Sequence, residues 1–170
     1  KLQEMIFKKY PSCGVTQSAT DVIIQLLGEN TIDPDLVDQI HIKVPPYAYK
    51  LVGQPFKMGD NPTVNAQFSI QYCVANVLLR GNSQLQHFEK DHISDPDIAS
   101  FIKKIHVASD EKMNQRGHTA IDMKILTAKG HEYFKKLDIA PGFPGNPLSQ
   151  DDHEDHFWDC MNYAPLPLKK

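Results

Sequence analysis

The chain has 170 residues, of which 41% are hydrophobic, and a formal net charge of −3 from 18 basic and 21 acidic residues. A chain of this length can bury one core without disulfides or metals, so we expect one domain over residues 1–170. The balanced charge lacks the basic field that binds a phosphate backbone, which argues against nucleic acid as a partner.

The cysteines and the apolar runs indicate the compartment. Cys13, Cys73 and Cys160 are odd in number and widely spaced, so neither a disulfide framework nor a cysteine-rich zinc site is indicated. No apolar run approaches the roughly 20 residues that cross a bilayer. These features favour a cytoplasmic protein with no membrane partner. Because Lys1 stands where an initiator methionine would, we expect the chain to be cut from a longer protein.

The first half of the chain is predicted to be mainly helical, with one strand. Residues 19–27 carry apolar side chains at helical spacing, and Gly28 is expected to stop this helix. Residues 40–44 alternate between apolar and polar and predict a half-buried strand. The segment 47–60 contains Gly and Pro without a clear period and is expected to be a long loop. The strongest helix is predicted over residues 61–81.

The second half begins with helices and changes to strands. Short helices are predicted near residues 85–90 and from Asp95-Pro96, then strands at 105–107, 120–126 and 133–139, and a last helix capped by Ser149. The last two strands are expected to form a hairpin, because Ala128-Lys129-Gly130 lies between them. This mixed order predicts an α+β fold with a small antiparallel or mixed sheet packed with helices.

The phrase KKYPSC, residues 8–13, is the most unusual in residue type. It brings a cation, a phenol, a hydroxyl and a thiol together before a helix start, where anions are attracted. Lys8 and Ser12 are therefore candidates for binding a carboxylate. The alternative is a strand end in which Tyr10 and Pro11 pack while the lysines are solvated.

Two further features carry open alternatives. Helical spacing places Tyr72 on the polar side of its helix, where its hydroxyl could reach a ligand, but a buried, hydrogen-bonded tyrosine is equally compatible. His153 and His156 lie one turn apart in DDHEDH, without an HExxH order or a third ligand. An acidic surface helix with incidental histidines explains them better than a metal site. No GxSxG elbow, Gly-rich phosphate loop or Walker lysine occurs.

Three phrases occur in order along the chain: KKYPSC, TVNAQFSIQYCVANVLLRG and GFPGNPLSQDD. Together they resemble the MmgE/PrpD family of 2-methylcitrate dehydratases and cis-aconitate decarboxylases, over residues 8–158. The middle phrase is the most specific, because A-x-F-S-x-x-Y-x-x-A followed by L-x-x-G exceeds what an amphipathic helix requires. The resemblance implies the C-terminal lid domain of a two-domain enzyme. An all-helical N-terminal domain, absent from this chain, would dimerise the protein and share the active site.

The resemblance also implies residue roles. Lys8 would clamp a substrate carboxylate, with Ser12 beside it, and Tyr72 would orient the carboxylate or donate a proton. Cys13 matches a position where some relatives have His, and Gln17 stands where many relatives have His. These two departures leave the exact reaction open.

The implied function is a cofactor-independent lyase that dehydrates or decarboxylates a small di- or tricarboxylate. The full-length protein would be a homodimer, and the isolated fragment would be inactive. Two alternatives stay open. One is a non-catalytic ligand-binding or dimerisation module of the same fold. The other is a carboxylate isomerase or epimerase, since all these reactions remove a proton next to a carboxylate.

Overall fold

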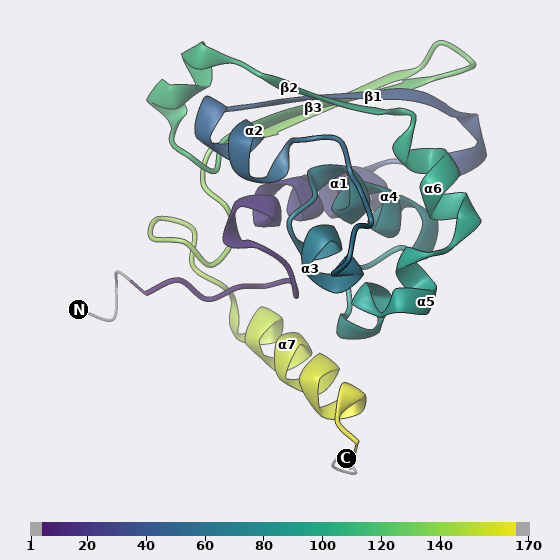
Figure 1. Cartoon of the computed structure of the whole chain (residues 1–170). Coiled ribbons are helices and arrows are strands. Elements are labelled where there is room, and N and C mark those ends of the chain that lie inside the picture. Colours follow the sequence, from purple (N-terminus) through teal and green to yellow (C-terminus); the bar gives the residue numbers. More distant parts are fainter. Residues whose placement is uncertain (1–4, 166–170) are drawn as a thin grey trace.

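A four-stranded sheet forms one layer of the computed structural model, which describes residues 5–165, and helices gather on one of its faces (Figure 1). The strand order is β2-β1-β3-β4, with β1 and β2 parallel and the other pairs antiparallel. The strands are β1 (Val37–Val44), β2 (Ile105–Ser109), β3 (Ile121–Thr127) and β4 (Glu132–Leu137). The mixed sheet and the α+β class are as predicted. Lys1, on which the expectation of a longer protein rests, lies outside the described residues.

The side-chain alternation of β1 decides which face of the sheet is covered. Ile40, Ile42 and Val44 are buried, whereas His41 and Lys43 between them are exposed. Because side chains of a strand alternate between faces, one face meets the helices and the other faces away from them.

Two of the helices next to the sheet are α1 (Gln17–Glu29) and α4 (Ile70–Arg80), which also pack against each other. Gly28 does not stop α1, contrary to expectation: it lies within the last turn, exposed and in open space. The backbone N–H and the side-chain amide of Asn30 both donate to the Leu26 carbonyl, which ends the helix after Glu29.

Two further expectations about helices were wrong. The segment expected to be a loop begins with α2 (Pro46–Val52), because Pro46 occupies the first helical turn, where a missing N–H costs nothing. The predicted long helix is two helices, α3 (Pro62–Gln67) and α4. The Ser69 side chain accepts a hydrogen bond from the Tyr72 N–H and so caps α4 as a new helix. Gly81 ends α4 in the left-handed conformation, as predicted.

The remaining elements include the predicted short helices near residues 85–90 and from Asp95-Pro96 and the last helix after Ser149, together with turns that were not predicted. They are 3-10 turns at Gly14–Thr16, Pro34–Leu36, Leu85–Phe88 and Glu111–Arg116, and helices α5 (Lys90–Ile93), α6 (Pro96–Ile102) and α7 (Gln150–Tyr163). The β3-β4 hairpin is confirmed, and Ser149 caps α7 in a capping box with Asp152. Helix α7 has no fully buried residue and projects away from the sheet and its covering helices (Figure 1). Within residues 5–165, no helix is both long and apolar enough to span a membrane.

Candidate anion-binding pocket

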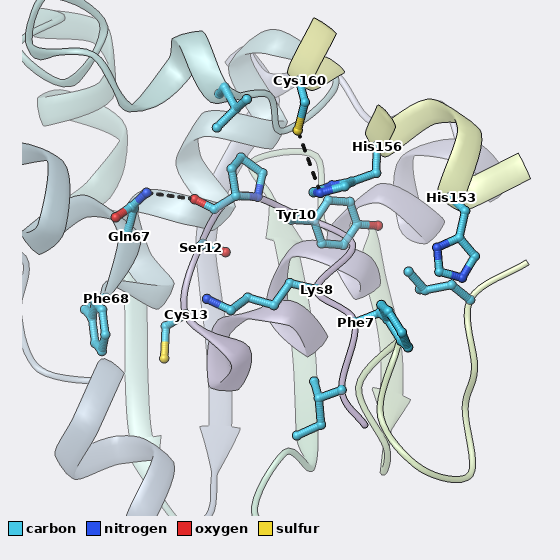
Figure 2. Close-up of a pocket in the computed structure, with 14 residues that line it drawn as sticks. Phe7, Lys8, Tyr10, Ser12, Cys13, Gln67, Phe68, His153, His156 and Cys160 are labelled. Carbon is cyan, nitrogen blue, oxygen red and sulfur yellow. Dashed lines mark hydrogen bonds between the residues drawn. The ribbon is translucent and has the colours of Figure 1, made fainter. Parts of the chain in front are cut away.

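A cavity of about 480 Å³ lies between the KKYPSC loop, the junction of α3 and α4, and helix α7 (Figure 2). It joins parts of all three phrases that carry the family resemblance. None of the fourteen described residues that line it is acidic, and its charged group is the ammonium of Lys8. Such a lining suits an anion with an apolar portion.

Gln17 holds the backbone of the KKYPSC loop in place. Its fully buried side chain accepts a hydrogen bond from the Tyr10 N–H at 2.9 Å and donates one to the Tyr10 carbonyl at 3.0 Å. Both polar backbone groups of Tyr10 are therefore bonded to one amide. Gln17 thus has a structural task in this chain and lies behind the loop, outside the lining of the cavity.

Tyr10 and Lys9 are engaged with carboxylates. The Tyr10 hydroxyl donates to Asp21 at 2.7 Å; burial raises the pKa of this phenol strongly, and the negative charge of Asp21 adds to the effect. The Lys9 ammonium lies 2.8 Å from Asp152 and 3.4 Å from Asp21. Burial would lower the pKa of Lys9, but these two carboxylates outweigh burial and raise it. Lys9 is therefore neutralised by its neighbours.

Lys8 differs from Lys9 in this respect. Its side chain is exposed, and within residues 5–165 its ammonium makes no hydrogen bond or ion pair. Figure 2 shows this ammonium extending toward Cys13. Of the two adjacent lysines, Lys8 is the one available to bind an anion.

Ser12 and Cys13 line the same cavity as Lys8, so the structure brings these three predicted residues together. The Ser12 hydroxyl is buried, 2.8 Å from the Thr16 hydroxyl. The Cys13 N–H donates to the Gln67 carbonyl at 2.9 Å, and the Gln67 side chain donates to the Pro11 carbonyl. These bonds fasten the loop to the end of α3.

Tyr72 is not brought to the cavity. It is fully buried, its ring packs between Phe56 and Phe88, and its hydroxyl donates to the carbonyl of His87. Burial raises the pKa of Tyr72 to about 12, and Arg80 opposes that rise. This placement corresponds to the buried, hydrogen-bonded alternative.

The burial of helix α4 explains why helical spacing alone did not show that Tyr72 is enclosed. Every residue from Tyr72 to Leu78 is buried, including the polar Asn76. The helix is enclosed on all sides, so the side expected to be polar and open is occupied by neighbouring elements. Its polar side chains bond to protein groups; the Asn76 amide, for example, donates to the Asn82 carbonyl.

His153 and His156, taken above as incidental, line the cavity together with Cys160 (Figure 2). Their spacing of three and four residues puts them on one side of α7. That spacing was visible in the sequence, but the position of the helix was not. Among the described residues no group of three or more His, Cys, Asp or Glu could hold a metal ion.

A close backbone contact at Gly142 places the phrase GFPGNPLSQDD beside the segment that leads into KKYPSC. The Phe7 N–H donates to the Gly142 carbonyl at 3.0 Å. Gly142 has a φ of +81°, and a Cβ on it would lie 1.7 Å from the Phe7 carbonyl oxygen. Only glycine permits this approach, which sets the path of the segment leading to Lys8.

Comparison with known proteins identifies the family of the chain. The MmgE/PrpD C-terminal domain matches residues 10–165, so the chain belongs to this family. Cis-aconitate decarboxylase from Homo sapiens is 24% identical over 161 residues, which cover 91% of this chain and 32% of that protein. The chain thus spans about a third of the length of this curated relative.

Proposed function

We propose that this chain is the lid domain of a cofactor-independent lyase that dehydrates or decarboxylates a small di- or tricarboxylate. The observation that carries the proposal is the cavity itself, which presents the unpaired ammonium of Lys8 and has no acidic residue in its described lining. The family includes dehydratases and decarboxylases, and the matched relative is named for decarboxylation of cis-aconitate.

The chemistry divides between this chain and a helical domain. Lys8 binds one substrate carboxylate through a charge-assisted hydrogen bond, and the neighbouring Ser12 and Cys13 complete the polar side of that subsite. A lyase also needs a base or an electrophile at the reacting carbon. In this proposal the helical domain supplies that group. Tyr72 contributes only by holding the 3-10 turn that contains His87.

The rim of the cavity supports a partner domain. Ile6, Phe7 and Phe68 line the cavity and yet are 43–50% exposed. Large apolar side chains left exposed around one cavity favour contact with a partner. We place the helical domain of the same polypeptide over this rim, in a cytoplasmic homodimer.

The test compares this chain alone with the chain joined to its helical domain. NMR would follow conversion of 2-methylcitrate, citrate and cis-aconitate. Turnover is expected only with the helical domain, and Lys8→Ala should lower it by about tenfold or more, equivalent to at least about 1.4 kcal/mol of transition-state stabilisation. Lys129→Ala, at an exposed lysine of the β3-β4 turn, serves as the control.

Each other outcome has a clear meaning. Full activity of Lys8→Ala would remove Lys8 from the site. Turnover by the isolated chain would show that the reacting groups all lie here. Binding without turnover by the joined protein would favour a ligand-binding module, and conversion without loss of water or carbon dioxide would favour an isomerase or epimerase.

A further inference from the structure

We infer that His153 and His156 of α7 form a second anion-binding subsite of this cavity, so that the ligand is held by two carboxylates at once. One carboxylate binds at Lys8 and the other binds at the imidazoles. The inference rests on the proposed function, because it takes Lys8 as the first subsite.

The first argument is which polar groups of the cavity are free. The Tyr10 hydroxyl is bonded to Asp21, and the Gln67 amide donates to the Pro11 carbonyl at 3.1 Å. The Ser12 hydroxyl oxygen accepts a hydrogen bond from the Thr16 hydroxyl at 2.8 Å, and its own O–H belongs to the Lys8 subsite proposed above.

The ionisable nitrogen groups of the described lining are those of Lys8, His153 and His156, and none of them makes a hydrogen bond to an oxygen or nitrogen atom within residues 5–165. Within residues 5–165, the His153 side chain makes an edge-on ring contact with Phe7, with centroids 5.4 Å apart, and no hydrogen bond. His156 Nε2 lies 3.8 Å from the Cys160 Sγ, and sulfur is a weak partner. A cation and two imidazoles are all suited to carboxylates.

The second argument is the placement of these groups. In Figure 2, His156 points toward Cys160 on one side of the Tyr10 ring, while the Lys8 ammonium lies on the other side near Cys13. The two kinds of donor thus come from different walls of one cavity. An anion at one wall leaves the other free, so a ligand with two carboxylates can engage both.

The third argument concerns the acidic residues of α7, which would repel such a ligand. None of them lines this cavity; Asp152, Asp155 and Asp159 line an adjacent hollow that shares His156. Asp152 is paired with Lys9, and Asp159 accepts a hydrogen bond from the Leu85 N–H at 3.1 Å.

Those same two contacts hold α7 against the rest of the chain. Lys9 is adjacent to Lys8, so one ion pair links the loop that carries the first subsite to the helix that carries the second. The histidine wall therefore has a defined position, although α7 buries no residue completely.

The experiment compares glutarate with pentanoate, which have the same chain length and differ in the second carboxylate. Titration of the 170-residue chain, followed by NMR chemical shifts, should give a dissociation constant at least about tenfold lower for glutarate, since one charged hydrogen bond is worth about 1.5–3 kcal/mol. The double variant His153→Leu/His156→Leu should lose this preference and bind pentanoate as the wild type does.

Two further variants distinguish the loss of the imidazole donors from a distortion of α7. His153→Gln/His156→Gln retains amide donors, so it should keep part of the preference and shows whether the leucine variant merely distorts α7. His41→Leu, on the uncovered face of the sheet, should bind like the wild type.

The outcomes distinguish this inference from the proposal on which it rests. Equal binding of the two acids, or a preference that survives in both double variants, would overturn the histidine subsite. If Lys8→Ala still abolished binding in that case, the first subsite would stand. Absence of binding by either acid to the wild type would overturn both.

Discussion

Replacing Tyr72 by Phe removes one oxygen atom from the centre of the chain. The side chain is fully buried, and its hydroxyl donates to the His87 carbonyl, which closes the 3-10 turn over α4. After the substitution this carbonyl loses its donor while the ring stays packed between Phe56 and Phe88. The expected effect is therefore on stability.

The magnitude follows from the burial of the bond. Leaving a buried acceptor unsatisfied costs about 1–3 kcal/mol. For a domain of this size, each kcal/mol lowers the melting temperature by about 2–4 °C, so a loss of about 2 kcal/mol corresponds to roughly 4–8 °C. Tyr47→Phe is the matched control, because Tyr47 is 57% exposed and its change should stay within about 0.5 kcal/mol.

The assay is thermal and urea unfolding of the two variants, together with turnover in the protein joined to its helical domain. The role that the family resemblance implies for Tyr72 predicts a loss of turnover of about tenfold or more with unchanged melting. The structure predicts the opposite: a lower melting temperature and near-normal turnover well below it. Unchanged melting with lost turnover would refute the structural reasoning and return Tyr72 to the site.

Two other predictions concern stability. Gly28→Ala should stabilise the chain by about 0.5–1 kcal/mol, because a Cβ there meets no atom within 4 Å and glycine is a poor helix former; urea unfolding that shows destabilisation would contradict the helical placement. The second concerns Asp152. Partial burial would raise its pKa, but hydrogen bonds from Lys9 and Ser149 outweigh burial and lower it from 3.8 to about 2. A carboxyl whose pKa is lower in the folded than in the unfolded protein stabilises the fold at pH values above its unfolded pKa. It loses that contribution as the pH falls toward 2. Asp152→Asn should therefore reduce the free energy of unfolding at neutral pH by at most about 1 kcal/mol. In the variant this free energy should fall less steeply between about pH 4 and 2. An unchanged acid profile would show that the contact with Lys9 contributes nothing.

Local signals in the sequence determined most of the elements. The alternation in β1, the turn before β4 and the caps at Asp95 and Ser149 act over a few residues, and each predicted its element correctly. The errors arose where one residue type permits two outcomes. Pro46 can follow a strand or start a helix, and Ser69 can lie within a helix or cap a new one.

For the site, three phrases of the sequence were enough to identify the family and to single out Lys8, Ser12 and Cys13 as candidate ligand groups. The ion pairs that neutralise Lys9 and the enclosure of Tyr72 became visible in the folded chain. Only the tertiary structure brought the histidines of α7 to the KKYPSC loop. The physical reason is that these facts depend on contacts between segments more than 100 residues apart or on helices packed around α4, which local periodicity does not record.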